Sequence, residues 1–307
     1  MSWGKGKIWF DGKLIPWHDA KIHVLSHVIH YGSSVFESMR CYATSKGPAI
    51  FRMHAHIDRL YDSAKIYRMA IPFTKKEFAE ATINLVKANK LQTCYVRPIV
   101  LRGYGSLGVN PLKNPLHCVI AAWEWGEYLG EGTHEKGVSV KISSWHRPAP
   151  NTFPALAKAG GNYLNSQLIN MEASYDGFDE GIALDSNGLV SEGSGENIFM
   201  VRNGVIYTPP TSSSILAGIA RHSVFVIARQ LKIRVEQHTM PRESLYIADE
   251  VFFTGTAAEI TPVVEIDNIK IGDGKRGKIT TKIQHEFLQI VQGKKKDPNN
   301  WLTYINK

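Results

Sequence analysis

Apolar and polar residues at the start of the chain follow a pattern that predicts a β-hairpin. Residues 7–10 and 13–17 are strand-like, and Asp11-Gly12 lies between them. Asp-Gly supplies the positive φ angles that tight hairpin turns require. The same turn chemistry predicts two further hairpins, at Asn187-Gly188 and at Asn203-Gly204.

Helical periodicity follows at residues 54–69, where apolar residues recur on one face. These apolar residues are Ile57, Leu60, Tyr61 and Ala64. Arg59 falls on the opposite face, so it points either to solvent or into a site. A second helix is predicted to begin after Thr74, because Thr74 and Glu77 have the spacing of a capping box.

Later segments interleave hairpins with helices, which favours two α+β domains over one doubly wound parallel sheet. Strand-like runs lie at residues 94–101, 117–123, 138–144, 181–185 and 250–254, and helices are expected near residues 162–175 and 216–231. A turn-rich passage in residues 125–135 is the candidate linker. We therefore predict a smaller N-terminal domain, residues 1–124, and a larger C-terminal domain, residues 136–307, each with a mixed sheet and helices.

Composition is consistent with a globular protein of about two domains. The chain has 307 residues, of which 43% are apolar and 21% charged. Its apolar runs fall short of the roughly 18 residues that span a bilayer, and the N-terminus lacks a signal-peptide stretch. Cys41, Cys94 and Cys118 lie far apart. We therefore expect a cytoplasmic protein without a disulfide framework or a thiolate metal site, and we name no metal ligands.

The net charge is +8, but the basic residues are scattered rather than arranged in a stripe. The densest run, Lys294-Lys295-Lys296, is interpreted as a solvated turn. An anionic small-molecule cofactor and an anionic substrate would account for several arginines, so nucleic acid is a minor alternative.

Lys158 is the main candidate for chemistry, because it lies among alanines and a Gly160-Gly161 pair. Desolvation disfavours an ammonium group, so a lysine in such surroundings becomes a nucleophile toward carbonyls and can form a Schiff base. The local window alone favours the ordinary interpretation, a loop or helix-start lysine. Choosing between a reactive and an ordinary lysine requires other residues of the chain.

Several segments could complete a pyridoxal-phosphate site, which needs an acid for the pyridine nitrogen and a cradle for the phosphate. Glu192 and Glu196 lie on the same glycine-rich bend, and their chemistry alone does not choose between them. Gly218-Ile219-Ala220 lies at a predicted helix start, where unpaired N–H groups favour an anion. Gly255-Thr256-Ala257 offers further amides and a hydroxyl, and Arg59 could add a countercharge.

Together these residues resemble the branched-chain amino-acid aminotransferases, which are fold-type-IV (class IV) pyridoxal-phosphate enzymes. Five motifs carry the resemblance, in family order and over nearly the whole chain. They are His30-Tyr31-Gly32-Ser33-Ser34-Val35-Phe36-Glu37, Tyr95-Val96-Arg97-Pro98, Lys158-Ala159-Gly160-Gly161-Asn162-Tyr163, Glu192-Gly193-Ser194-Gly195-Glu196-Asn197 and Thr254-Gly255-Thr256-Ala257-Ala258-Glu259. The implied fold is the two-domain fold of the D-amino-acid aminotransferases.

The resemblance implies a role for each cofactor residue. Lys158 would hold the internal aldimine and move the proton between Cα and C4′, and Glu192 would pair with the pyridine nitrogen. Tyr163 would bind the ring oxygen and Leu216 would pack against the ring. The phosphate would be held by Arg59, Ile219, Ala220 and Thr256, on the loops that contain Gly218 and Gly255. The family often has Thr where this chain has Ala220, so only a backbone amide is expected there.

The resemblance also implies a substrate pocket. Its apolar part would consist of Phe36, Tyr31, Val109, Trp125 and Tyr128, with Tyr31 and Val109 coming from a neighbouring subunit. Tyr95, Thr256 and Ala257 would receive the α-carboxylate, and Arg97 the distal carboxylate of glutamate. Taken singly, each aromatic residue is more often core, and Arg97 could be a surface residue at a strand end. Ser38-Met39 departs from the family's usual Gly and Ile, with unknown effect on side-chain preference.

The implied activity is a ping-pong transamination of leucine, isoleucine or valine with 2-oxoglutarate, in at least a homodimer. A D-amino-acid or (R)-amine transaminase and an aminodeoxychorismate lyase share the lysine and the glutamate. The Tyr95-x-Arg97-Pro98 motif favours the L-branched-chain enzymes over these. A basic protein that binds anions without catalysis is a more distant alternative. Neither the relative substrate preference nor the direction in metabolism follows from the sequence.

Overall fold

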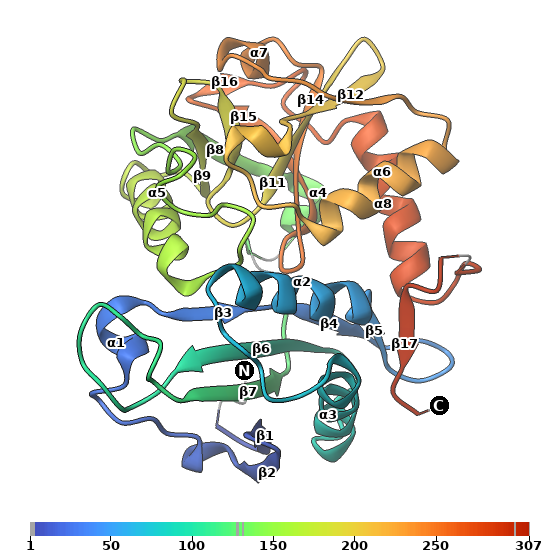
Figure 1. The fold of residues 1–307 in the computed structure, drawn as a ribbon. Coiled ribbons are helices and arrows are strands. Elements are labelled where there is room, and N and C mark those ends of the chain that lie inside the picture. The colour runs from blue at the N-terminus through green and yellow to red at the C-terminus, as the bar shows by residue number, and fades with distance from the viewer. Residues whose placement is uncertain (1–3, 127–128, 131, 298, 307) are drawn as a thin grey trace. The chain divides into compact units, whose positions relative to one another are not determined.

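The computed structural model describes residues 4–126, 129–130, 132–297 and 299–306 (Figure 1). It divides the chain into two compact units. Unit 1 contains Met1–Gly126, Ala157–Gly161 and Gln289–Lys307, and unit 2 contains Glu127–Leu156 and Asn162–Leu288. Each unit contains a β-sheet and helices, so the predicted α+β class is confirmed. We had placed residues 157–161, with Lys158, and residues 289–307 in the C-terminal domain, whereas both segments pack with unit 1.

The sheet of unit 1 has the strand order β17-β5-β4-β6-β7-β1-β2, and β3 pairs with β6. Its strands are β1 (Lys7–Phe10), β2 (Lys13–Pro16), β3 (Ser34–Phe36), β4 (Met39–Tyr42), β5 (Ala49–Phe51), β6 (Cys94–Arg102), β7 (Leu116–Trp123) and β17 (Leu302–Tyr304). Neighbouring strands in it run antiparallel. The predicted first hairpin is confirmed, with φ angles of 45° at Asp11 and 91° at Gly12.

Three α-helices belong to unit 1 within the described residues: α1 (His27–Tyr31), α2 (Met53–Ile66) and α3 (Lys75–Ala88). Helix α3 packs against β1 and β7, and α2 packs against α3 and β3. The capping box of α3 is confirmed, because Thr74 Oγ1 accepts from the Glu77 N–H at 3.2 Å and Glu77 Oε2 accepts from the Thr74 N–H at 2.6 Å. Ile57, Leu60 and Ala64 are buried in the core of unit 1, as predicted.

The sheet of unit 2 is mixed, with the order β10-β9-β8-β15-β14-β11-β12-β13 and with β16 on β15. Its strands are β8 (Val138–Ile142), β9 (Glu180–Leu184), β10 (Val190–Gly193), β11 (Asn197–Arg202), β12 (Val205–Thr208), β13 (Val235–Gln237), β14 (Glu250–Gly255), β15 (Glu259–Ile266) and β16 (Ile269–Lys270). The pairs β8–β9, β8–β15 and β12–β13 are parallel. The turns at Asn187-Gly188 and Asn203-Gly204 connect antiparallel pairs, as predicted.

Helices cover this second sheet. They are α4 (Thr133–Lys136), α5 (Tyr163–Tyr175), α6 (Ile219–Gln230), α7 (Glu243–Tyr246) and α8 (Lys278–Val291), with a short 3₁₀ turn, η3 (Thr211–Ser213). Two further 3₁₀ turns are η1 (Trp17–Asp19) in unit 1 and η2 (Gly160–Asn162) where the chain passes from unit 1 to unit 2. Helix α5 packs against β8 and β9, and α6 packs against β13 and β14. Among the described residues, none of the helices combines the length and apolarity that crossing a membrane requires.

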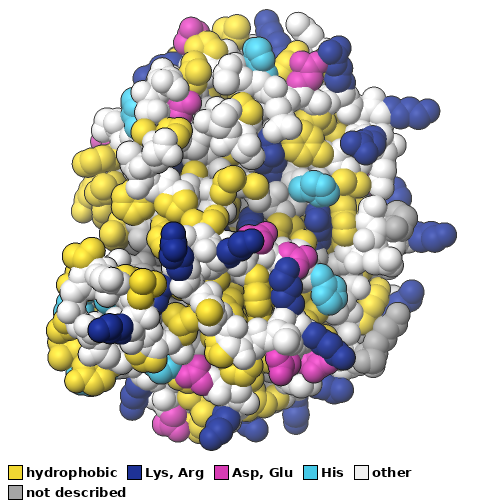
Figure 2. Space-filling model, in the orientation of Figure 1, with side chains coloured by type: hydrophobic (Ala, Val, Ile, Leu, Met, Phe, Trp, Pro, Cys, Tyr) yellow, Lys and Arg dark blue, Asp and Glu magenta, His cyan; other side chains and the backbone are white. Residues whose placement is uncertain are grey.

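Charged side chains are dispersed over the surface. Figure 2 shows Lys and Arg interspersed with Asp, Glu and hydrophobic side chains on the face it displays. Lys294, Lys295 and Lys296 are exposed after α8, in agreement with the predicted solvated turn.

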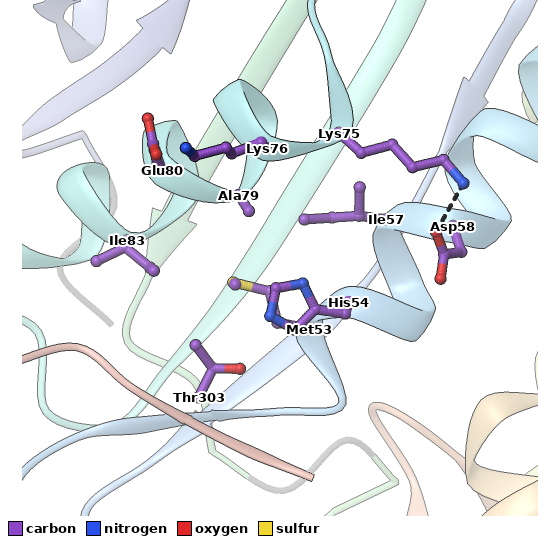
Figure 3. Close-up of a pocket in the computed structure, with 10 residues that line it drawn as sticks. All are labelled: Met53, His54, Ile57, Asp58, Lys75, Lys76, Ala79, Glu80, Ile83 and Thr303. Atoms are coloured by element: carbon purple, nitrogen blue, oxygen red, sulfur yellow. Dashed lines mark hydrogen bonds and ion pairs between the residues drawn. The ribbon is translucent and has the colours of Figure 1, made fainter. Parts of the chain in front are cut away.

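A surface cavity of about 390 Å³ lies between α2, α3 and β17 in unit 1. Met53, Ile57, Ala79 and Ile83 form its apolar part in Figure 3, and the ion pair between Lys75 and Asp58 lies at its rim. His54, Lys76, Glu80 and Thr303 complete the lining. Helical spacing places the cavity residues of α2 on the opposite side of the helix from His56, Arg59 and Ser63. The cavity is therefore separate from the residues considered next.

Candidate active site

Lys158 lies on a short segment that pairs with β3 in unit 1. Ala159 forms an antiparallel bridge with Val35, and the Lys158 carbonyl accepts from the Phe36 N–H at 2.9 Å. The Lys158 N–H donates to Ser63 Oγ of α2 at 3.0 Å. Small residues make this approach possible, since a Cβ on Gly160 would collide with Ser34 Oγ. The lysine is 9% exposed, and its Nζ lies 4.9 Å from the centre of the Phe36 ring.

Arg59 points from α2 to a buried carboxylate, Glu37, at the end of β3. Its Nε and Nη2 donate to Glu37 Oε1 and Oε2 at 2.5 and 3.0 Å. His56, one turn earlier on α2, donates from Nδ1 to Glu37 Oε2 at 2.7 Å. Burial alone would raise the pKa of Glu37, but Arg59 and His56 hold it far below its ordinary value. Of the two orientations that the sequence allowed for Arg59, the structure has the one that points into a site.

Arg97 lies in an aromatic cluster of the same unit. Its guanidinium carbon lies 4.8 Å from the centre of the Phe36 ring and 5.3 Å from that of Tyr95, and Nη2 donates to the Tyr95 hydroxyl at 3.4 Å. Trp125 contacts Tyr95, with ring centres 4.9 Å apart. The Nε of Arg97 is buried without a hydrogen-bond partner in the structure. Arg97 is thus a half-buried cation whose Nε is buried without a partner, so it is not a fully solvated residue at a strand end.

Two other predicted pocket residues, Tyr31 and Val109, are exposed. Tyr31, at the end of α1, is 46% exposed, and Val109, in the loop after β6, is 85% exposed. Within unit 1 these two segments are joined, because His27 Nε2 lies 2.9 Å from the Gly108 carbonyl oxygen. Tyr128 lies outside the residues that the structure describes.

Glu192 lies on β10 in unit 2 and is 8% exposed. Its Oε2 accepts from Asn197 Nδ2 at 2.9 Å and from the Leu216 N–H at 3.1 Å, and its Oε1 lies 3.3 Å from Arg147 Nε. The carboxylate is therefore fixed from β11, from the loop before α6 and from the segment after β8. Asn197 Nδ2 also donates to the Leu216 carbonyl, which links Leu216 to the same group.

Glu196 lies in a different electrostatic environment from Glu192. Burial and the neighbouring carboxyl of Glu180 raise the pKa of Glu196 well above its ordinary value of 4.5. A raised pKa disfavours the anionic form that pairs with a pyridinium. Glu192, in contrast, forms an ion pair with Arg147, so its assignment as the partner of the pyridine nitrogen stays the prediction.

Helix α6 begins in a way that suits an anion. Gly218 is its N-cap, without a side-chain cap bond, and the first turn contains no acidic residue. Ile219 and Ala220 are the first helical residues and are buried. A side chain on Gly218 would collide with Asn197 Oδ1, so glycine allows the loop to approach the Glu192 group. The N–H groups at this helix start fit the predicted phosphate cradle.

The other predicted residues of unit 2 lie at the ends of elements. Thr256 and Ala257 form the turn between β14 and β15, directly after Gly255. Because α6 packs against β14, this turn and the start of α6 belong to the same part of unit 2. Tyr163, half-buried, is the first residue of α5.

Sequence reasoning missed three members of these groups: His56, Arg147 and the role of Glu37. Glu37 was part of a recognised motif, and His56 lies three residues before Arg59 on the predicted helix, so spacing could have joined them. Arg147 carried no signal of its own. Only the fold brings it to the backbone carbonyls of Gly193 and Ser194, where Nη2 donates at 2.6 and 2.9 Å.

Comparison with known proteins assigns the family. The model of the amino-transferase class IV family matches residues 34–266. The branched-chain-amino-acid aminotransferase of Escherichia coli K12 is 48% identical over 98% of this chain and 97% of its own. This chain belongs to the class IV aminotransferases. It is thus an enzyme, and the resemblance found in its motifs is confirmed.

Solved structures agree with this membership. The crystal structure of the Escherichia coli branched-chain amino acid aminotransferase has a TM-score of 0.97 at 48% identity, covering 98% of this chain and 100% of that one. The T.th. branched-chain amino acid aminotransferase in complex with N-(5'-phosphopyridoxyl)-L-glutamate has a TM-score of 0.94 at 48% identity, covering 98% of this chain and 99% of that one. The predicted fold of a class IV aminotransferase is therefore confirmed.

Proposed function

We propose that this aminotransferase transfers the amino group of L-leucine, L-isoleucine or L-valine to 2-oxoglutarate, giving branched-chain 2-oxo acids and L-glutamate. The cofactor is pyridoxal 5′-phosphate. The observation that carries the proposal is Arg97, a half-buried cation whose buried Nε lacks a hydrogen-bond partner, beside the aromatic rings of Phe36 and Tyr95. Trp125 contacts Tyr95 in the same cluster. One pocket has to accept both an aliphatic side chain and the distal carboxylate of glutamate. An arginine within apolar walls supplies both surfaces.

We assign a residue of this chain to each group of the cofactor. Lys158 binds its aldehyde, Glu192 pairs with its ring nitrogen and Tyr163 binds its ring oxygen. Its phosphate is held by Arg59, Ile219, Ala220 and Thr256, on the loops of Gly218 and Gly255, while Leu216 packs against the ring. The uncapped start of α6 and the fixed carboxylate of Glu192 support these assignments. Ala220 contributes only its backbone N–H, because it has no hydroxyl.

Two half-reactions follow in a ping-pong order. When bound, the cofactor supplies an aldehyde and an electron-withdrawing ring that stabilises negative charge at the substrate's α-carbon. Lys158 would take the α-proton of the amino acid and return it to C4′ of the cofactor, a general acid–base step typically worth about 10²–10⁴-fold in rate. Tyr95 and the amides of Thr256 and Ala257 hold the α-carboxylate. Arg97 then holds the distal carboxylate of 2-oxoglutarate in the second half-reaction.

Replacing Lys158 tests the chemistry directly. Lys158→Ala is expected to abolish both turnover and the visible absorbance of the bound cofactor, whereas Lys87→Ala, on the exposed side of α3, should change neither. Wild-type enzyme with 2-oxoglutarate should use L-leucine, L-isoleucine and L-valine in preference to D-alanine and (R)-amines. Transamination by Lys158→Ala, or a preference for D-alanine, would contradict the proposal.

We also propose a homodimer, or a larger assembly of dimers, in which Tyr31 and Val109 serve the partner's substrate pocket. Exposed apolar side chains on α1 and the loop after β6 support this arrangement, as a monomer would leave them in water. They include Val24, Ile29, Tyr31, Tyr104, Leu107, Val109 and Leu112.

Mixed dimers test this assignment. Val109→Asp and Lys158→Ala should each be inactive alone. Coexpressed, they should regain activity, because one site of each mixed dimer combines an intact lysine with an intact Val109. A monomeric wild-type enzyme, or mixtures without recovered activity, would contradict it.

For the cellular location we propose the cytoplasm. Cys41, Cys94 and Cys118 are buried free thiols, which suits a reducing compartment.

A further inference from the structure

Glu37 is a completely buried carboxylate at the centre of unit 1, and none of the roles proposed above uses it. Its side chain is 0% exposed, and it follows β3 directly. A buried ion pair is a weak source of stability, because removing two charges from water costs about as much as their attraction returns. Such a pair beside the reactive lysine calls for another explanation.

The two oxygens of Glu37 are saturated. Oε1 accepts from Arg59 Nε at 2.5 Å. Oε2 accepts from Arg59 Nη2 at 3.0 Å, from His56 Nδ1 at 2.7 Å and from the Ser38 N–H at 3.1 Å. A carboxylate has about four acceptor positions in total, and Glu37 accepts four hydrogen bonds, one at Oε1 and three at Oε2. The carboxylate can neither rotate nor exchange partners without losing a buried hydrogen bond.

This saturation fixes the plane of the Arg59 guanidinium. Two donors on one edge, Nε and Nη2, bind the two oxygens of one carboxylate, which is the planar fork geometry of arginine. When that edge is fixed, the direction of Nη1 on the other edge is fixed as well. His56 and the Ser38 amide hold the carboxylate in its turn, so the orientation of Arg59 is set by both β3 and α2.

The same two elements hold Lys158. The Phe36 N–H, adjacent to Glu37, donates to the Lys158 carbonyl, and Ser63, one turn after Arg59, accepts from the Lys158 N–H. Glu37 joins β3 to α2 between these two attachment points. A change in its contacts would therefore alter the position of the arginine relative to the lysine.

We propose that Glu37 is a positioning residue that orients Arg59 toward the phosphate of the cofactor, with His56 holding the Glu37 carboxylate in place. This inference rests on the proposed function, since it takes Arg59 as a phosphate ligand and Lys158 as the covalent attachment. It predicts a defect in recognition of the phosphate group rather than of the aldehyde or the ring.

The test compares the binding of pyridoxal 5′-phosphate and of pyridoxal, which lacks the phosphate, to the apoenzyme by equilibrium titration. Glu37→Gln preserves the size of the side chain but removes its charge and one acceptor. We expect affinity for pyridoxal 5′-phosphate to fall by about 10-fold, the lower end of the effect that loss of an orienting partner has at metal sites. Affinity for pyridoxal should change by less than about 2-fold.

Two further variants separate positioning from loss of structure. Leu85→Ala removes a fully buried side chain of α3 outside this group, so it should lower stability while both affinities stay unchanged. Glu37→Asp keeps the charge and withdraws it by one methylene. This variant tests the same proposal if Glu37→Gln does not fold. It should also lose affinity for pyridoxal 5′-phosphate but not for pyridoxal, by a smaller factor.

A loss equal for both compounds, an unchanged preference in the folded Glu37 variants, or tighter binding of pyridoxal 5′-phosphate would overturn the inference. The proposed function fails separately, when the wild-type apoenzyme binds neither compound or shows no preference for the phosphorylated one. If wild type shows that preference and both folded Glu37 variants retain it, only the positioning role of Glu37 is refuted.

Discussion

Each unit contains a group of buried carboxylates, and the two groups differ in their balance of charge. In unit 1, Glu37 alone accepts from Arg59 and His56. In unit 2, Glu180, Glu192 and Glu196 lie around the guanidinium of Arg147. The pKa of Glu37 is far below its ordinary value, although burial opposes this shift. Burial raises the pKa of Glu180, and burial together with the carboxyls of Glu180 and Glu192 raises that of Glu196. Burial is common to both groups, so the supply of cations decides which carboxyl stays ionised.

The difference suggests distinct uses. Unit 1 holds a permanent ion pair, which suits the orientation of a guanidinium. In unit 2 the raised pKa values of Glu180 and Glu196 favour their neutral forms, and Glu192 is the carboxyl in an ion pair with Arg147. That distribution suits a single carboxylate that pairs with a pyridinium, as proposed for Glu192.

The largest expected effect comes from removing the anion of unit 1. Glu37→Gln should lower the free energy of unfolding of the apoenzyme by about 3–5 kcal/mol, because Arg59 cannot lose its proton and its charge loses the Glu37 carboxylate. Urea unfolding at neutral pH measures this loss. Glu80→Gln, on the exposed side of α3, serves as control and should stay within about 0.5 kcal/mol of wild type. Equal midpoints for both variants would remove the contrast between the two groups.

The fold was predictable where local rules operate. The hairpin at Asp11-Gly12 and the capping box at Thr74 depend on a few adjacent residues, and the apolar face of α2 depends on a simple period. The segment with Lys158 was placed in the other domain because contiguity along the chain suggested it. Its pairing with β3 is a long-range contact, and no periodicity or turn residue encodes that contact.

The site was predictable only in part for the same reason. Motifs predicted Lys158, Glu192 and Arg97 as site residues, and the helical face of residues 54–69 together with the resemblance predicted Arg59. Neither could show how buried groups share charge. The choice between Glu192 and Glu196 depended on Arg147, which is 45 residues away from Glu192 in the chain and is brought to it by the fold. The roles of Tyr31 and Val109 stay predictions, since they depend on a second chain.

An intermediate loss of stability is expected when Arg147, the cation among the buried carboxyls of unit 2, is replaced. Arg147→Met should destabilise the protein by about 3 kcal/mol at neutral pH, the lower end of the range for breaking a buried ion pair. Carboxyls can take up protons where arginine cannot lose one, so the deficit should shrink as the pH falls toward about 5. Thermal unfolding at several pH values measures it. Arg202→Met removes an exposed ion pair with Asp249 and should cost less than about 1 kcal/mol. A deficit of equal size at all pH values would contradict proton uptake.

The smallest expected effect is a gain in stability, opposite in sign to the loss expected for Glu37→Gln. Above 4.5, the ordinary value for a glutamate, the folded protein keeps a proton on Glu196 that the unfolded chain has released. The contribution of the Glu196 carboxyl to the stability of the wild type is therefore fully present below pH 4.5. It is lost as the pH rises through the raised pKa of Glu196. Glu196→Gln carries no proton to lose, so it should be more stable than wild type by about 1 kcal/mol in mildly alkaline solution.

This gain should vanish below pH 4.5, where the glutamate is increasingly neutral in the unfolded state as well as in the folded one. Glu37 contributes in the reverse sense, since its lowered pKa gives stability that is present above 4.5 and is lost as the pH falls. The same Glu→Gln substitution should thus stabilise unit 2 at high pH and destabilise unit 1 there. Thermal midpoints of both variants across the pH series measure the two signs together. A Glu196→Gln enzyme that is less stable than wild type at high pH would mean that Glu196 is ionised, and the two groups would then differ in size but not in kind.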